Sequence, residues 1–194
     1  MTRIIAGSAG GRRLRTPAHS ATRPTTDRVR EAAFSLVGDW AGTLGEPAER
    51  MLEGLSFLDL YAGSGAVALE AASRGARPVW AVESDAGTAR IARGNATATG
   101  LPVTVVATTV EKALGAPPPA RFDVVWADPP YDLPGERLAP VLAAVQERWL
   151  ATDGLLVVER ATRDLAPVWP PELSERWDRR YGETTLYFAG RSPA

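Results

Sequence analysis

Short apolar runs alternate with longer segments of helical periodicity through most of the chain. Five apolar runs predict strands, at residues 56–60, 78–82, 103–107, 122–126 and 155–159. The segments between them predict helices at residues 65–74, 86–99, 110–114 and 135–149. Gly75 and Gly100 follow two of these helices, where glycine commonly provides the left-handed end of a helix. The alternation predicts an α/β fold with a parallel, doubly wound sheet.

The two ends of the chain break this alternation. Near the N-terminus, residues 3–6 and 12–15 predict a small hairpin, and residues 38–53 predict an irregular linker. Between them Thr26 can cap a helix over residues 27–37, with an apolar face made of Val29, Ala32, Ala33, Leu36 and Val37. Near the C-terminus, residues 176–181 and 184–188 predict an antiparallel hairpin around Gly182-Glu183. We therefore expect an N-terminal arm over residues 1–37 and a main domain over residues 50–194.

Composition narrows the chemistry open to this chain. Its 194 residues are enough for one domain, and 45% apolar with 23% charged residues is typical of a soluble globular protein. Without cysteine, thiolate metal sites and cysteine nucleophiles are excluded, and the single lysine, Lys112, does not belong to a Walker-type phosphate loop. The only histidine, His19, lies in a polar segment. No run is long enough for a membrane helix or a signal peptide, so we expect a cytoplasmic protein that binds neither membrane nor metal.

Charge is distributed very unevenly. Residues 1–30 have a balance of +6 and the remainder −7, which sum to the net charge of −1. A basic arm on an acidic body suggests contact with a polyanion such as nucleic acid. Residues 1–30 contain one acid, Asp27, and seven arginines, which are the candidate RNA contacts: Arg3, Arg12, Arg13, Arg15, Arg23, Arg28 and Arg30.

The first strand of the main domain leads directly into the glycine-rich loop Tyr61-Ala62-Gly63-Ser64-Gly65. Its glycines permit a tight turn and a close approach of ligand to backbone, and the following helix presents free N–H groups. Glu83 closes the second strand, where a carboxylate can accept both ribose hydroxyls of an adenosine cofactor. These features leave NAD and S-adenosylmethionine as the two candidate cofactors.

The tetrapeptide Asp128-Pro129-Pro130-Tyr131 favours S-adenosylmethionine. It follows the fourth strand, which neighbours the first strand across the switch point of a doubly wound sheet. The prolines fix the directions of two acceptors, the Asp128 carboxylate and the Pro129 carbonyl, beside the aromatic ring of Tyr131. Such a group suits the exocyclic amine of a planar base, and hydride transfer has no need of it.

With these residues the chain resembles class I methyltransferases that carry the [D/N]-P-P-[Y/F] motif. The segments Gly10-Gly11-Arg12-Arg13-Leu14 and Arg23–Glu31 make it similar to the RsmD family of bacterial 16S rRNA guanine-N2 methyltransferases. The resemblance implies a seven-stranded sheet with an antiparallel last strand. It also implies a monomer that acts on 16S rRNA, within a small-subunit particle.

The resemblance also assigns cofactor contacts. It implies that Asp59 and the Gly63–Gly65 loop hold the methionine end, with Tyr61 and Ser64 in the same loop, and that Glu83 holds the ribose. The adenine contacts would be Thr109 and the backbone of Val110. Asp128 and Pro129 would orient the guanine amine, and Asp128 would accept its proton.

Three alternatives remain open. Another exocyclic-amine methyltransferase, acting on adenine N6, would use the same acceptors. A NAD-dependent oxidoreductase would share Gly63, Gly65 and Glu83 but would leave Asp128–Tyr131 without a role. A silent RNA-binding module would keep the fold without catalysis.

Overall fold

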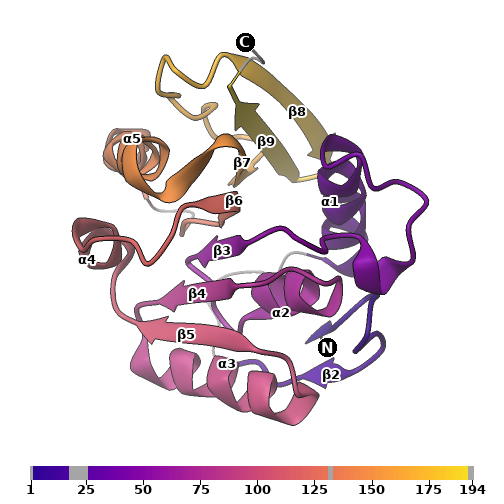
Figure 1. The fold of residues 1–194 in the computed structure, drawn as a ribbon. Coiled ribbons are helices and arrows are strands. Elements are labelled where there is room, and N and C mark those ends of the chain that lie inside the picture. The colour runs from indigo at the N-terminus through magenta and orange to yellow at the C-terminus, as the bar shows by residue number, and fades with distance from the viewer. Residues whose placement is uncertain (1, 18–25, 131–132, 192–194) are drawn as a thin grey trace.

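A seven-stranded sheet organises the chain, as the computed structural model shows for residues 2–17, 26–130 and 133–191 (Figure 1). Within these residues the strand order is β5-β4-β3-β6-β7-β9-β8. The first five strands along this order are parallel, whereas β9 is antiparallel to both β7 and β8. The bounds are β3 (Phe57–Leu60), β4 (Val79–Glu83), β5 (Val103–Ala107), β6 (Phe122–Ala127), β7 (Leu150–Ala161), β8 (Glu175–Tyr181) and β9 (Thr184–Gly190). This confirms the α/β sheet and its antiparallel last strand.

Helices cover both faces of the sheet (Figure 1). One face packs against α1 (Asp27–Trp40), α2 (Ala66–Ser73) and α3 (Ala86–Thr99), with apolar side chains such as Phe34, Leu69 and Trp126 in one core. The other face packs against α4 (Val110–Gly115) and α5 (Gly135–Ala144), around Leu114, Leu142 and Val158. Alternate residues of each buried strand point to opposite faces, so continuous apolar runs supply both cores.

The order of the strands creates the switch point that the sequence predicts. β3 lies between β4 and β6, and Leu60 of β3 pairs with Ala127 of β6. The loops that follow β3 and β6 therefore start at the same edge of the sheet and lead to helices on opposite faces. In open α/β sheets, ligands bind in the crevice between two such loops.

The N-terminal hairpin and α1 pack into the main core. Strands β1 (Thr2–Arg3) and β2 (Arg13–Leu14) pair antiparallel, and Ile4, Leu14 and Phe34 are buried in the same cluster as Trp126. Thr26 caps α1 by accepting a hydrogen bond from the Val29 N–H. The described parts of this segment, residues 2–17 and 26–37, thus share one hydrophobic core with the sheet instead of forming an arm of their own.

Several element bounds differ from those that the sequence predicts. α1 continues to Trp40 instead of ending at residue 37, and a Cβ at its Gly38 would lie 3.3 Å from the Met51 side chain, which would have to shift slightly. The helix expected over residues 135–149 changes at Val145 into a π-helical turn, η2 (Val145–Trp149). β7 begins at Leu150 rather than 155 because Leu150 pairs with Phe122, and the pairing then shifts register before Val124 meets Leu155.

Candidate active site

The loop between β3 and α2 has the backbone that its glycines permit. Gly63 and Gly65 both have positive φ, and a side chain at Gly65 would meet the Cβ of Ala92 of α3 at 3.3 Å. Tyr61 also has a positive φ of 63°, which is uncommon for a residue with a side chain. The backbone N–H of Gly63 donates to Glu83 at 2.8 Å, so the loop is fixed to the end of β4.

Asp59 is a buried carboxylate at the end of β3. It is 1% exposed, and its Oδ2 accepts a hydrogen bond from the Ala68 N–H in α2 at 2.9 Å. Burial raises its pKa to about 8, an effect that the Ala68 hydrogen bond offsets and that nearby Glu83 and Glu159 increase. A cation placed here would therefore favour the ionised form of Asp59.

Glu83 faces the same loop from β4. Its two carboxylate oxygens accept from the N–H groups of Gly63 and Asp85, each at 2.8 Å. These bonds fix the carboxylate in place, and its remaining lone pairs are the acceptors available to a ligand.

Asp128 lies across the switch point from these groups, directly after β6. Its N–H donates to the Leu60 carbonyl at 3.4 Å, so the motif is tied to β3. Burial raises its pKa well above the usual range for an aspartate; Glu159 and then Asp59 raise it further, and Arg160 lowers it. Pro129 is buried and Pro130 is exposed at the rim. Tyr131 lies outside the described residues, so its stacking stays a prediction.

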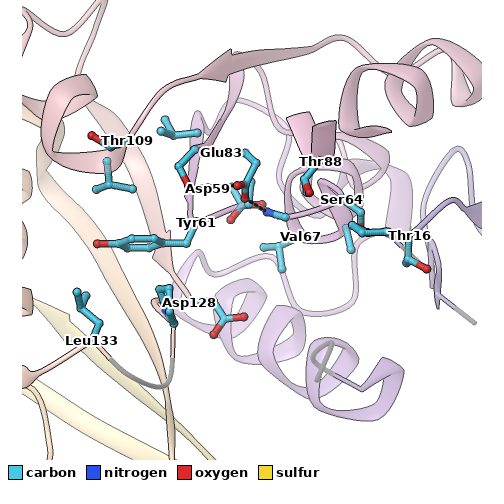
Figure 2. A pocket seen from close by; sticks show the side chains of 18 of the residues that line it. Thr16, Asp59, Tyr61, Ser64, Val67, Glu83, Thr88, Thr109, Asp128 and Leu133 are labelled. Atoms are coloured by element: carbon cyan, nitrogen blue, oxygen red, sulfur yellow. Dashed lines mark hydrogen bonds between the residues drawn. The ribbon is translucent and has the colours of Figure 1, made fainter. Parts of the chain in front are cut away.

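A cavity of about 510 Å³ connects these groups. It is lined by Asp59, Tyr61, Gly63, Ser64, Glu83, Thr109, Val110, Asp128 and Pro130, which are nine of the residues singled out in the sequence. In Figure 2 Thr109, Tyr61 and Leu133 lie toward one end, and Ser64, Val67 and Thr16 toward the other, with Asp59 and Glu83 between them. The structure thus brings residues of both motifs to one cavity, although the predicted site residues Gly65 and Pro129 are not among those that line it.

The end of the cavity near α4 is formed by Thr109, Val110 and Tyr61. Thr109 caps α4 and accepts a hydrogen bond from the Lys112 N–H at 3.2 Å, so one acceptor site of its hydroxyl is already used. The buried Tyr61 hydroxyl has no hydrogen-bond partner within the described residues. Burial and Glu111 raise the Tyr61 pKa to about 12, with Arg137 acting in the opposite direction, so this hydroxyl is a protonated donor.

Other cavity residues were not found from the sequence. Thr2, Thr16 and Pro17 come from the N-terminal segment, and Leu133 and Arg137 from the region before and within α5. None of them belongs to a recognisable motif. Only the packing of the hairpin and α5 against the sheet brings them to the site.

The basic residues of the N-terminal segment divide into two groups. Arg3, Arg12, Arg13, Arg15 and Arg28 are at least partly exposed, as RNA contacts must be, and Arg23 lies outside the described residues. Arg30 is only 1% exposed and lines the cavity, so its prediction as a surface RNA contact is wrong. Arg30 lies one and two helical turns before Phe34 and Val37, which places it on the buried side of α1.

Two features are absent from the described residues. They contain no group of three or more histidine, cysteine, aspartate or glutamate side chains arranged to hold a metal ion. No helix among them is long and apolar enough to cross a membrane.

Comparison with known proteins identifies relatives along nearly the whole chain. The family described as Conserved hypothetical protein 95 matches residues 2–190. Ribosomal RNA small subunit methyltransferase D of Escherichia coli (strain K12) is 31% identical over 196 residues, covering 93% of this chain and 85% of that protein. The putative rRNA methyltransferase YlbH of Bacillus subtilis is 33% identical over 162 residues, with 81% of each chain covered.

A solved structure supports the same relationship. A hypothetical protein of Thermus thermophilus superimposes with a TM-score of 0.78 and 34% identity, covering 98% of this chain and 99% of that one. These matches confirm the resemblance seen in the sequence motifs. The chain belongs to the family described as Conserved hypothetical protein 95, the RsmD family of rRNA methyltransferases.

Proposed function

We propose that this protein transfers a methyl group from S-adenosylmethionine to the exocyclic N2 of a guanine in 16S rRNA. The observation that carries the proposal is that Asp128 and Pro130 line the same cavity as Asp59, Gly63 and Glu83. Base acceptors and cofactor-binding groups thereby meet at the switch point of the sheet. The membership of the RsmD family supports the same reaction.

The cavity residues fit S-adenosylmethionine. A volume of about 510 Å³ lies within the usual range for small-molecule sites. Glu83 would accept the ribose hydroxyls, and Thr109 with the Val110 backbone would meet the adenine. Asp59 would stabilise the cationic methionine end, because a positive charge offsets the cost of its burial. When bound, the cofactor supplies a methyl group that its sulfonium already activates for transfer.

Asp128 and Pro129 would orient the guanine amine. Both acceptors are directed by a chain that two prolines stiffen, so the amine nitrogen can be held in line with the methyl group without a moving part. Ionised Asp128 would then accept the proton that the amine releases. The raised pKa makes ionised Asp128 a stronger base than an ordinary aspartate, and the positive charge of the cofactor would favour that ionised form.

The exposed arginines of the N-terminal segment would contact the RNA backbone. Arg3, Arg12, Arg13, Arg15 and Arg28 lie at the surface of the hairpin and the first turn of α1, whereas the rest of the chain is acidic. Thr2, Thr16 and Pro17 of the same segment line the cavity, so this surface adjoins the site. We infer that a cytoplasmic monomer acts on 16S rRNA within a small-subunit particle.

Product analysis tests this proposal. Small-subunit particles or 16S rRNA from cells that lack the protein would be incubated with the purified enzyme and labelled S-adenosylmethionine, then digested and examined by mass spectrometry. We expect N2-methylguanine. N6-methyladenine would favour the alternative acceptor, and no transfer to either RNA would contradict the proposal.

Asp128→Ala serves as the catalytic control in the same assay. The rate should fall about 100-fold or more, because one orienting and acid–base group is removed. Cofactor affinity measured by calorimetry should stay close to that of the original protein. A variant that keeps more than about a tenth of the rate would contradict the role of Asp128.

A further inference from the structure

Arg30 is a buried cation in contact with the cavity. Its side chain is 1% exposed, and one guanidinium nitrogen donates to the Arg3 carbonyl and to Asp27, the latter at 3.0 Å. Its Nε has no hydrogen-bond partner among the described residues. A guanidinium remains charged in a protein, and burying it without full compensation is costly.

The nearest buried carboxylate, Glu70 of α2, does not complete this compensation. It lies 3.8 Å from the Arg30 Nε, too far for a hydrogen bond. Its oxygens already accept from the N–H groups of Ile5 and Ala6 and from Arg74, whose Nε is at 2.8 Å. Asp27 and Glu70 thus lie within ion-pair distance of the Arg30 guanidinium, but its Nε remains a donor without a hydrogen-bond partner among the described residues.

The contacts of Arg30 place it at a defined end of the cavity. It packs beside Glu70, one helical turn after the cavity residue Val67, and beside the backbone of Arg3, next to the cavity residue Thr2. The other basic residue among the described lining residues, Arg137, lies 3.9 Å from Glu111 of α4, near Thr109 and Val110. Arg30 thus adjoins the part of the lining that includes Thr2 and Val67, whereas Arg137 adjoins the part formed by α4.

We propose that Arg30 binds the α-carboxylate of the cofactor's methionine end. The inference rests on the proposed function: if adenine lies at Thr109 and ribose at Glu83, the amino-acid end must extend toward Val67 and Arg30. The carboxylate is the anionic group of that end, and a guanidinium is well suited to it because paired N–H donors match its two oxygens. Asp59 would then contact the cationic groups of the methionine end, and the Arg30 guanidinium would contact its carboxylate.

The proposal also explains why this arginine is not a surface residue. Its neighbour Arg28 lies on the same first turn of α1 and is at least partly exposed. A phosphate of a folded RNA could approach Arg28 but not a side chain that is 1% exposed. The ligand of Arg30 must be small enough to enter the cavity.

Paired ligands provide the test. Calorimetry would compare S-adenosylmethionine with its decarboxylated form, which keeps the adenosine, the sulfonium and the amine. The original protein should bind the carboxylate-bearing ligand more tightly by about 10- to 100-fold, the range expected for a hydrogen bond to a charged group. Arg30→Met should remove most of this preference by weakening S-adenosylmethionine alone, and Arg30→Lys should restore part of it.

Arg74→Met is the matched control, because Arg74 is buried, pairs with the same Glu70, and is not among the cavity-lining residues. It should lower the melting temperature but leave the ratio of the two affinities unchanged. Equal affinities of the original protein for both ligands would overturn the role of Arg30, and this measurement needs no variant to fold. If neither ligand bound the original protein, the proposed function itself would fail.

Discussion

Two buried carboxylates on the same side of the sheet, Glu70 and Asp59, have opposite surroundings. Glu70 is fully buried, and its oxygens accept hydrogen bonds from two backbone N–H groups and from Arg74. Asp59 has one such bond, from Ala68, and its neighbours Glu83 and Glu159 carry the same sign of charge. The fold thus compensates one carboxylate fully and leaves the other in need of a positive charge.

This difference separates a structural charge from a ligand-binding one. Glu70 joins the backbone of the N-terminal hairpin to α2, so it holds in place the segment that supplies Thr2, Thr16 and Pro17 to the cavity. Asp59 lines the cavity itself, where a cationic ligand can replace the missing compensation. The Ala68 hydrogen bond offsets part of the free-energy cost of burying ionised Asp59, and a cationic ligand would offset more of it.

Glu70→Ala should produce the largest effect on stability. It leaves Arg74 and the Ile5 and Ala6 N–H groups buried without their acceptor, and breaking a buried ion pair in this way costs about 3–5 kcal/mol. Urea denaturation would measure the loss. Glu53→Ala is the control, since Glu53 pairs with Arg50 on the exposed surface and its removal should leave stability nearly unchanged. Similar losses in the two variants would contradict the comparison.

The contacts of Glu70 also mean that a deletion of the N-terminal hairpin would not test RNA binding alone. The hairpin contributes Ile4 and Leu14 to the main core and supplies both backbone donors of Glu70. Its removal would therefore disturb the fold and the cavity together, and single exposed arginines are the better targets.

Asp59 should lower the stability of the folded protein as the pH rises. Because its pKa is raised to about 8 in the folded protein, the folded state binds more protons than the unfolded state between about pH 4 and 8. The stabilisation that comes from protonated Asp59 is fully present below about pH 4 and is lost as the pH rises through about 8. Asp59→Asn keeps the acceptor for the Ala68 N–H. It should reduce the fall in the free energy of unfolding with pH by up to about 1.4 kcal/mol per pH unit.

Asp85→Asn provides a control of opposite sign. Hydrogen bonds from Thr88 lower the pKa of Asp85 in the folded state, so its contribution is present above the unfolded pKa and is lost only as the pH falls through the folded value. The free energy of unfolding would be measured from about pH 5 to 9. Its slope against pH should change in Asp59→Asn and stay the same in Asp85→Asn. An unchanged slope for Asp59→Asn would show that Asp59 is already ionised.

Arg13→Ala should give the smallest effect, because Arg13 belongs to the exposed part of the segment that Glu70 anchors. If it contacts one phosphate, the log–log salt dependence of RNA binding should flatten by about 0.7–0.9. Arg50→Ala removes another exposed arginine, before the amino-terminal end of β3, and should leave the slope unchanged. Equal slopes for Arg13→Ala and the original protein would show that Arg13 does not contact RNA.

Local sequence determined most of the fold and the centre of the site. The alternating pattern predicts the parallel strands and their helices, and Thr26, Gly75 and Gly100 mark helix ends, because these features depend on backbone geometry within a few residues. The two motifs could be assigned to one crevice because the strand order of a doubly wound sheet brings their loops together.

Tertiary packing alone decided the surroundings of each charge. The seven arginines of the N-terminal segment look alike in the sequence, yet Arg30 is buried whereas Arg28 is not. The spacing of Arg30 from Phe34 and Val37 indicates its buried side only once Phe34 is known to pack against the core. Likewise Glu70 and Asp59 are both carboxylates flanked by apolar residues, and only the contacts made across the fold separate them. Burial and pairing depend on residues distant in the chain, so local sequence cannot determine them.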